Sequence, residues 1–206
     1  MARTSAVAYG LVLAAGRGRR AGGPKALRSD AAGRPWVVRA VDTLRAGGCG
    51  SVLVVAGAAA DEVRAVLAAE DVHVVPAANW DQGMGTSLRA GLAALDSTDA
   101  QIACVHLVDL PDVGSDVVAR LLTTAVGVDT LARATYASGP GHPVLLGRAH
   151  WPAVRTAARA DTGARDYLAA TRVRLVDCSD LAGGRDVDGP AELPSAASAT
   201  TEVPGA

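Results

Sequence analysis

The feature that most constrains the fold is a regular alternation of short apolar runs with segments that carry apolar residues at helical spacing. The apolar runs occupy residues 7–14, 51–56, 72–75 and 102–107, and the helical patterns occupy residues 35–46, 61–69, 84–95 and 116–125. Strand, helix and strand in succession form the repeating unit of a parallel sheet with helices on both faces. We therefore expect an α/β fold, a Rossmann-like three-layer α/β/α arrangement with a mostly parallel sheet.

The strict alternation breaks in the last third of the chain. Residues 130–135 and 142–146 resemble strands on either side of a turn at 138–141, and a helix at 162–170 and a strand at 173–176 follow. A short acidic turn at 186–193 completes the pattern. The remaining residues are Ala, Ser, Thr and Pro without a periodic face, which is typical of disorder. We expect one domain over residues 1–193 and a disordered tail over 194–206.

Composition narrows the classes of partner and compartment. The formal net charge of the 206 residues is −1 and no basic block stands alone, so we expect neither nucleic acid nor a membrane surface as partner. The chain has no Phe and 50% hydrophobic residues, so its core must consist of Val, Leu and Ala. The three cysteines lack metal-ligand or disulfide spacing, which predicts buried free thiols. No apolar run is long enough to span a bilayer, and we expect a cytoplasmic protein.

A glycine-rich loop with the chain's only lysine follows the first apolar run. Gly16, Gly18 and Gly22 allow the backbone to approach a ligand with its N–H groups, and Arg20 and Lys25 add positive charge. Lysine is a compact point charge, in contrast to the flat fork of arginine, and it suits a crowded phosphate. This combination indicates a polyphosphate site.

Two other interpretations of the loop stay open. The loop is not a P-loop, because no Ser or Thr follows Lys25 and the four-residue spacer is missing. A degenerate G-x-G-x-x-A match at residues 16–21 leaves a dinucleotide-binding oxidoreductase as a rival, although Asp42, near the position of the ribose-binding acid, falls in a helical pattern. The plainest alternative is a flexible loop with solvated arginines.

Carboxylates occupy two places suited to a metal ion. Asp109 follows an apolar strand, where it could hold Mg²⁺ against phosphate oxygens, or it could be a turn residue or the N-cap of the next helix. Asp186 and Asp188 lie on one side of an extended segment near the end of the fold. A cationic loop and metal-binding carboxylates in one chain favour an enzyme that acts on phosphoryl groups.

Two further segments could bind ligands. Gly83 to Ser87 place hydroxyls and N–H groups at the start of a helix, where they could recognise an anion or the edge of a base, or simply cap the helix. His142 follows the glycine-proline turn and could contact a second substrate or close the turn. The remaining histidines are expected to be structural: His73, His106 and His150.

Taken together, these residues resemble the MobA/MocA-like nucleotidyltransferases, the molybdenum-cofactor guanylyl- and cytidylyltransferases. The resemblance spans about residues 7–193 and implies an NTP-transferase domain of the nucleotide-diphospho-sugar transferase type. The family signature after the first strand is L-A-A-G-x-G/S-x-R-M-G-x-x-K, which places Arg20, Gly22 and Lys25 on triphosphate-binding positions. It implies that the nucleotide is also bound by Leu13, Ala14, Ala15, Gly16, Gly18, Gly83 and Ser87, and that the metal, Mg²⁺ or Mn²⁺, is held by Asp109 and Asp188.

The acceptor side resembles the family less closely. Residues 186–193 are similar to the closing motif D-I-D-T-P-E-D-L, but Gly189 and Ala191 replace Thr and Glu. The segment from Gly141 to Val144 is similar to R-G-H-P-V and implies that His142 lies beside a pterin, but residues 138–140 replace a basic stretch. Leu13-Ala14-Ala15-Gly16, in place of L-A-G-G, is similar to the cytidylyl branch of the family. In that branch the methyl group at the Ala15 position implies less room for a purine, which favours CTP over GTP.

The implied reaction is attack by a terminal phosphate of a pterin-type cofactor on the α-phosphorus of the nucleoside triphosphate, with release of pyrophosphate. Lys25, Arg20 and Asp109 would carry the catalysis, and a molybdoenzyme or its chaperone would be a partner. Three alternatives stay open: an NAD(P)H-dependent oxidoreductase on the same scaffold, a sugar-phosphate nucleotidyltransferase, and a non-catalytic nucleotide-binding partner in cofactor maturation.

Overall fold

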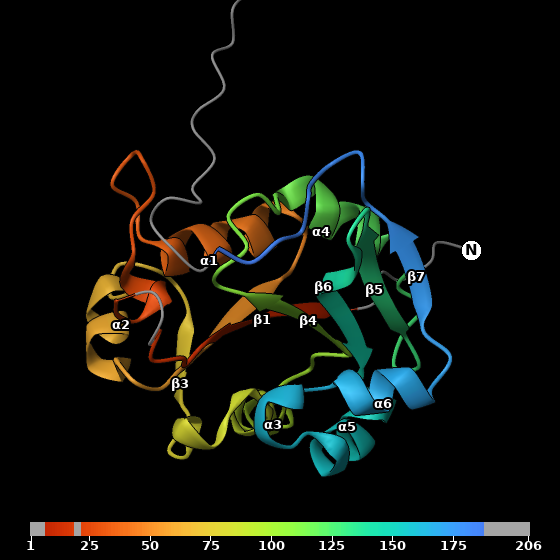
Figure 1. The fold of residues 1–206 in the computed structure, drawn as a ribbon. Helices are drawn as coiled ribbons and strands as arrows, with labels where there is room; N and C mark the ends of the chain where they lie inside the picture. Colours follow the sequence, from red (N-terminus) through yellow and green to blue (C-terminus); the bar gives the residue numbers. More distant parts are fainter. Residues whose placement is uncertain (1–6, 19–21, 188–206) are drawn as a thin grey trace, which may run out of the picture.

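The computed structural model describes residues 7–18 and 22–187 (Figure 1). These residues form a seven-stranded sheet in the order β3-β2-β1-β4-β6-β5-β7. Only β6 runs antiparallel to its neighbours, so the mostly parallel α/β expectation is confirmed. The strands are β1 Ala8–Ala14, β2 Ser51–Ala56, β3 His73–Pro76, β4 Ile102–Leu107, β5 Leu131–Tyr136, β6 Gly139–Gly147 and β7 Arg174–Asp177.

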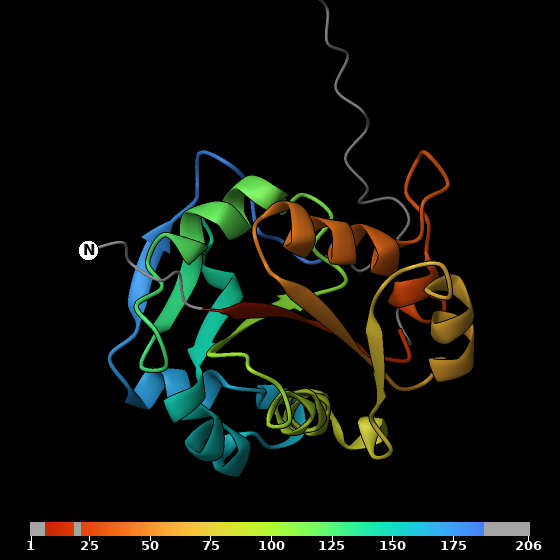
Figure 2. The ribbon, with the colours of Figure 1, turned by 180° about the vertical axis from the view of Figure 1, so that it is seen from behind.

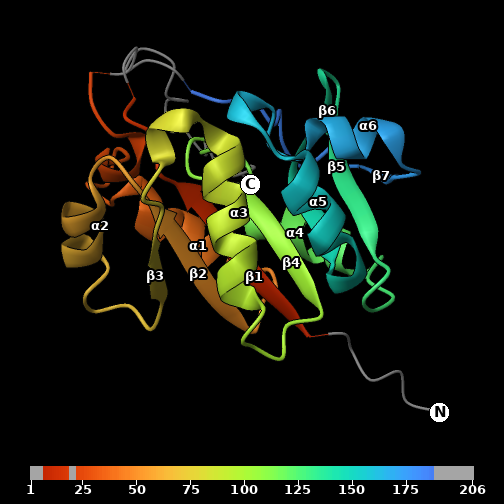
Figure 3. The same ribbon diagram turned by 90° about the horizontal axis from the view of Figure 1, so that it is seen from below.

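Helices cover both faces of the sheet, as Figures 1 and 2 show. On one face lie α1 and α4, and on the other lie α3, α5 and α6; Figure 3 shows α3 crossing in front of the central strands. The helices are α1 Trp36–Ala46, α2 Ala60–Val66, α3 Met84–Leu95, α4 Ser115–Leu122, α5 Trp151–Ala157 and α6 Arg165–Ala170.

Alternate residues of β1 supply the two halves of the core. Val12 packs with the α1 and α4 layer, whereas Leu11 packs with the α3 and α5 layer. A Cβ at Gly10 would lie 2.8 Å from Leu44 Cδ1, and a Cβ at Gly91 would lie 2.7 Å from Leu11 Cδ1. These glycines let α1 and α3 approach the sheet closely, which suits a core built mainly from Val, Leu and Ala.

The acceptor side of the chain departs from the expected elements. Helix α5 was not expected, because its seven residues are too few for a clear helical period. Strand β6 begins at Gly139, inside the expected turn, because Gly139 pairs with Tyr136 and leaves a two-residue connection. The expected helix at 162–170 is a 3-10 turn over Ala160–Thr162 followed by α6. The expected turn at 186–193 and the tail lie largely outside the described residues.

The topology places the candidate loops at one edge of the molecule. The carboxyl ends of β1, β2, β3 and β4 meet there because these strands are parallel. Ligands in open α/β sheets bind beyond this edge. In the part of the chain that the structure describes, no helix is long and apolar enough to cross a membrane.

Candidate functional site

The centre of the site is an ion pair between the loop that follows β1 and the loop that follows β4. Lys25 Nζ lies 2.9 Å from Asp109 Oδ2, and the two side chains are 14% and 20% exposed. Lys25 begins a 3-10 turn that Ala26, 1% exposed, anchors in the core, and Asp109 lies just beyond the end of β4. The helix after Asp109 has Gly114 at its N-cap, so the N-cap alternative for Asp109 is wrong. Both predicted groups therefore face each other at the carboxyl edge.

The glycine loop is held in shape by its own backbone. Gly23 N–H donates to Gly18 O at 3.2 Å, and a Cβ at Gly18 would lie 1.9 Å from Gly23 O. Gly18 and Gly22 have φ of 62° and 75°, in the left-handed region that favours glycine. Gly16 has open space around its Cα. The loop thus leaves room for a ligand beside Lys25; Arg20, a predicted phosphate ligand, lies outside the described residues.

The start of α3 faces the same edge of the sheet, and its hydroxyl side chains do not cap the helix. Gly83 has φ of 107°, and a Cβ there would lie 2.4 Å from the Ala160 carbonyl carbon. Thr86 Oγ1 donates to Asn79 O and Gly83 O, so it closes the preceding turn, and neither Thr86 nor Ser87 caps the helix. Ser87 is 3% exposed on the face of α3 that packs toward the sheet. The capping alternative is therefore wrong for both hydroxyls.

The end of β1 forms a tight corner beneath the first loop. Leu13, Ala14 and Ala15 are at most 8% exposed, and Ala15 O accepts from Ala58 N–H at 3.1 Å. The Trp80 side chain packs on the Cα of Gly57, in the loop after β2. The Arg17 guanidinium lies 5.0 Å from the Trp80 ring centroid, a cation–π contact. The residues that bound this corner come from three separate loops, which follow β1, β2 and β3.

A cavity of about 380 Å³ opens next to the ion pair. Its walls combine apolar side chains with charged side chains from five elements and loops. Leu13, Asp109, His142 and Asp186 are the predicted site residues that line it, and the cavity joins the nucleotide side to the predicted acceptor side. The other lining residues that matter here are Leu88, Val105, Leu146, Arg133, Asp161 and Arg165.

A C-terminal strap over residues 183–187 closes one side of this cavity. Asp112 Oδ2 accepts from Gly183 N–H and Gly184 N–H at 2.8 and 2.9 Å. Val187 N–H donates to Asp109 O at 3.0 Å. Tyr136 packs its ring where Cβ atoms of Gly184 and Gly141 would lie, and its hydroxyl donates to His142 O at 2.5 Å. The strap is thereby fixed to both Asp109 and the β5–β6 hairpin.

Two histidines near the site are held neutral. Burial, with smaller contributions from His106 and Arg133, lowers the pKa of His142 to about 3. Burial and the charge of Arg39 lower the pKa of His106 to about 4. His142 lies on β6 and lines the cavity, so it does not close the turn. At neutral pH the cavity therefore presents an uncharged imidazole.

The donor set fits a hard divalent cation bound together with phosphates. Among residues 7–18 and 22–187 no three His, Cys, Asp or Glu side chains cluster around one point. Asp109 supplies one carboxylate at the loop that faces the polyphosphate candidate. Mg²⁺ typically takes one or two carboxylates and completes its shell with phosphate oxygens and water. Asp188, the second predicted ligand, lies outside the described residues.

The family of the chain follows from comparison with known proteins. Residues 10–175 match the model of the MobA-like NTP transferase domain. The chain belongs to this family. Nicotine blue oxidoreductase of Paenarthrobacter nicotinovorans, a relative of this MobA-like chain, is 39% identical over 189 residues, which cover 87% of this chain and 91% of that protein.

Solved structures carry the same architecture. Rv0371c of Mycobacterium tuberculosis H37Rv superposes with a TM-score of 0.74 and 27% identity, covering 90% of this MobA-like chain and 95% of that one. The same protein was also solved in complex with manganese. A nucleotidyl transferase of Methanothermobacter thermautotrophicus, Mth528, gives a TM-score of 0.76 at 22% identity over 90% and 93% of the two chains. The resemblance, the fold type and a nucleotidyltransferase-type domain are thus confirmed.

Sequence reasoning missed four side chains that shape the cavity. Asp112 and Tyr136 hold the strap, and Arg133 and Arg165 line the cavity. Asp112 carried a weak signal, since it follows Asp109 by three positions. The other three gave none, because their roles depend on contacts between segments far apart in sequence.

Proposed function

We propose that this chain transfers a nucleoside monophosphate, CMP from CTP, onto a terminal phosphate of a pterin-type cofactor and releases pyrophosphate. The observation that carries the proposal is the Lys25–Asp109 pair, which places an ammonium and a carboxylate between a glycine-rich loop and a cavity. One group suits the triphosphate and the other suits its metal ion. The cavity supplies space for a second substrate on the opposite side of the pair.

The proposed reaction needs no protein nucleophile. An acceptor oxygen forms a bond to the α-phosphorus while the bond to the bridging oxygen of pyrophosphate breaks. The acceptor phosphate is already ionised, so the protein has to position the reactants and neutralise developing charge. N–H groups of the Gly16 to Gly22 loop, Lys25 and Arg20 would bind the β- and γ-phosphates.

Asp109 and Asp188 would hold Mg²⁺ or Mn²⁺, which neutralises charge on the phosphates when bound. Because Asp109 already contacts Lys25, nucleotide binding would exchange this ion pair for two new ones. Lys25 would turn to the phosphates and Asp109 to the metal. The ion pair thus keeps both groups in place before the substrate arrives.

The nucleobase preference rests on the corner at the end of β1. Ala15 is 5% exposed and belongs to the buried cluster that also includes Leu13, Leu53 and Val55. An alanine at this position is similar to the cytidylyl branch of the family, and this similarity supports cytosine as the base. Gly83 and Ser87 would contact the nucleotide from the start of α3.

Thermal shift with CTP, GTP, UTP, ATP and NADPH, each with and without Mg²⁺, tests the assignment. A cognate ligand at a hundredfold excess over Kd raises stability by about 2.7 kcal/mol. We expect the largest shift with CTP and Mg²⁺, followed by pyrophosphate release when a pterin phosphate is added. Stabilisation by CTP and Mg²⁺ without pyrophosphate release would indicate a non-catalytic nucleotide-binding partner instead.

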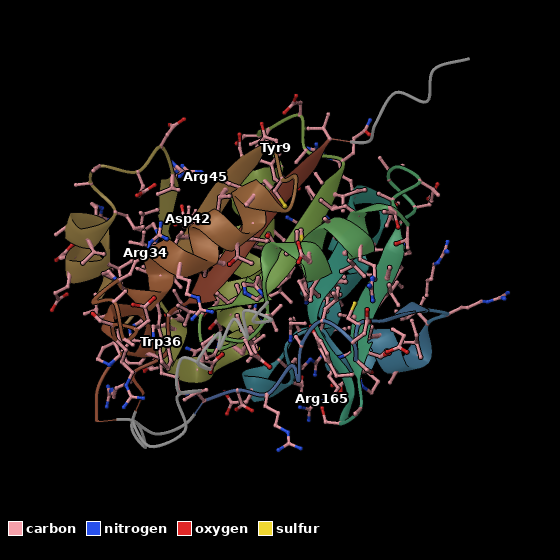
Figure 4. The ribbon with its side chains drawn as sticks, turned by 90° about the horizontal axis from the view of Figure 1, so that it is seen from above. Tyr9, Arg34, Trp36, Asp42, Arg45 and Arg165 are labelled. Atoms are coloured by element: carbon pink, nitrogen blue, oxygen red, sulfur yellow. The ribbon has the colours of Figure 1, made fainter. Side chains whose placement is uncertain are left out.

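A second candidate is an NAD(P)H-dependent oxidoreductase, and the 39% identity with nicotine blue oxidoreductase favours it. The geometry of the first loop favours it less. A dinucleotide-binding loop opens directly into a helix, whereas α1 begins at Trp36, 20 positions after Gly16. Asp42 lies within α1 and pairs with Arg34, as Figure 4 shows, so it does not face a ribose. Stabilisation by NADPH without metal would reverse our ranking.

A further inference from the structure

Two guanidinium groups line the cavity without a carboxylate partner among the described residues. Arg133, on β5, donates from Nε and Nη2 to Gly141 O at 3.3 and 3.2 Å. Arg165, the first residue of α6, is exposed and makes no ion pair within the described part of the chain. Both side chains line the same cavity. Tyr9 lies near the start of β1, and in Figure 4 Arg165 lies at the opposite end of the view from it.

The two arginines line the same cavity, and the charge of one acts on the other. Partial burial and the charge of Arg165 lower the pKa of Arg133. Five other arginines of the described residues pair with carboxylates, whereas Arg89 and Arg148 donate to backbone carbonyls. These pairs are Arg34 with Asp42, Arg45 with Glu70, Arg64 with Asp61, Arg120 with Asp180 and Arg155 with Asp96. Arg133 and Arg165 form no such pair within the described residues, although both line the same cavity.

The acidic side chains of the cavity do not neutralise them. Asp109 is paired with Lys25. Asp161 is turned toward the start of α3, because a Cβ atom added at Gly83 would lie 2.7 Å from Asp161 Oδ1. Asp186 is exposed on the strap and forms no ion pair within the described residues. The positive charge of Arg133 and Arg165 therefore remains available to a ligand.

We propose that Arg133 and Arg165 bind an anionic group, a phosphate or a carboxylate, of the second substrate. A guanidinium fork matches the oxygens of either anion. The apolar body of the substrate would lie against Leu88, Val105 and Leu146. The identification of this ligand as the acceptor rests on the proposed function, but the anion site itself is a property of the cavity.

Isothermal titration of the full chain with phenyl phosphate, benzoate and benzyl alcohol tests the site. The three ligands share an aromatic body and differ in charge. We expect phenyl phosphate or benzoate to bind more tightly than neutral benzyl alcohol. The stronger of the two anions identifies the group as phosphate or carboxylate. Equal binding of all three ligands would show that the cavity recognises only the ring and would overturn the proposal.

Variants locate the site. Arg165→Gln, a surface change that the fold should tolerate, and Arg133→Gln should each weaken binding of the preferred anion about tenfold, because each removes a charge-assisted hydrogen bond. Arg172→Gln is the matched control, since Arg172 is an exposed arginine outside the cavity lining and should change the affinity less than twofold by the same argument. Unchanged affinity in Arg165→Gln and Arg133→Gln, or an equal loss in Arg172→Gln, would overturn the proposal.

A further pair of measurements separates this inference from the proposed function. Arg165→Gln should leave the stabilisation by CTP and Mg²⁺ unchanged. Lys25→Ala should lose that stabilisation and keep the affinity for the aromatic anion. If the anion affinity depends on Lys25 and not on the arginines, the anion site is wrong while nucleotide transfer stands. If CTP never binds but the arginines hold the anion, the proposed function fails and the site stands.

Discussion

The nucleotide half of the site and the cavity half are held in place by different means. The first loop takes its shape from its own backbone, through the left-handed Gly18 and the hydrogen bond that Gly23 N–H donates to Gly18 O, and one ion pair joins it to the loop after β4. The cavity half depends on side chains that tie a C-terminal strap to Asp112 and to the β5–β6 hairpin. We infer that phosphate binding is set locally, whereas acceptor specificity depends on long-range contacts.

The largest expected effect is that of Lys25→Ala. Removal of the ammonium takes away charge stabilisation of the phosphates, and loss of one such group typically lowers kcat by about 10²- to 10³-fold. The side chain is partly exposed, so the fold should remain intact. Pyrophosphate release by the variant, with circular dichroism as the check on folding, measures the effect. A fully active variant would sink the assignment of Lys25.

Asp109→Asn tests the other member of the pair and should be nearly as severe. The amide keeps the shape of the side chain but is a far weaker ligand for Mg²⁺. We expect the Mg²⁺-dependent part of the CTP thermal shift to disappear together with turnover. Asp116→Asn, a change of an exposed carboxylate in the first turn of α4, is the matched control and should behave as wild type. A variant that retains the metal-dependent shift would show that Asp109 is not a ligand.

Asp112→Ala probes the cavity half. It removes the acceptor of two backbone N–H groups, and hydrogen bonds to a charged group contribute about 1.5–3 kcal/mol each in sheltered positions. We expect KM for the acceptor to rise about tenfold while the affinity for CTP and Mg²⁺ changes little, since about 1.4 kcal/mol corresponds to tenfold.

Asp112→Asn supplies the control for that experiment. Its amide oxygen can still accept both N–H groups of the strap, so KM for the acceptor should stay near the wild-type value. An equal loss of CTP affinity in Asp112→Ala would contradict the separation of the two halves.

Gly18→Ala tests whether the loop is set by its own backbone. An alanine would have to adopt a left-handed φ and would clash with Gly23 O, so we expect a loss of about 1–2 kcal/mol in stability and weaker CTP binding. Gly16→Ala is the matched change, because among the described residues no atom beyond its chain neighbours lies within 4 Å of its Cβ position. It should leave the unfolding free energy unchanged. Equal stability of the two variants would show that the Gly18 turn carries no constraint.

The same contrast explains what could be predicted from the sequence. The parallel strands, the glycine loop, Lys25 and Asp109 were predictable because each is encoded by neighbouring residues. The cavity was not, because Asp112, Tyr136 and Arg165 come together only when β5, α6 and the strap are folded against one another. Helix α5 was missed because seven residues carry too few helical periods. The early start of β6 was missed because its first residues, Gly139 to Gly141, have the composition of a turn. The predicted roles of Arg20 and Asp188 stay predictions, as both lie outside the described residues.

The effect that is smallest at neutral pH concerns protonation of the strand that joins the two halves. His106, on β4, is 2% exposed and its Nδ1 has no hydrogen-bond partner among the described residues. Its pKa is lowered to about 4, while an ordinary histidine has a pKa of 6.5. Between these values the unfolded chain binds a proton that the native protein does not. Stability should therefore fall as the pH falls from 6.5 to 4, by at most about 1.4 kcal/mol per pH unit from this group.

His106→Gln removes the titrating group. The unfolding free energy, measured with urea, should therefore depend less steeply on pH between 6.5 and 4, and its pH dependence above pH 7 should match that of the wild type. The readout is a slope, so it stands even if the variant is less stable at every pH. His142→Gln gives the corresponding measurement in the cavity, where burial lowers the pKa to about 3. If only His142→Gln flattens the profile, the pKa of His106 is not lowered in the folded protein, and the prediction for β4 is wrong.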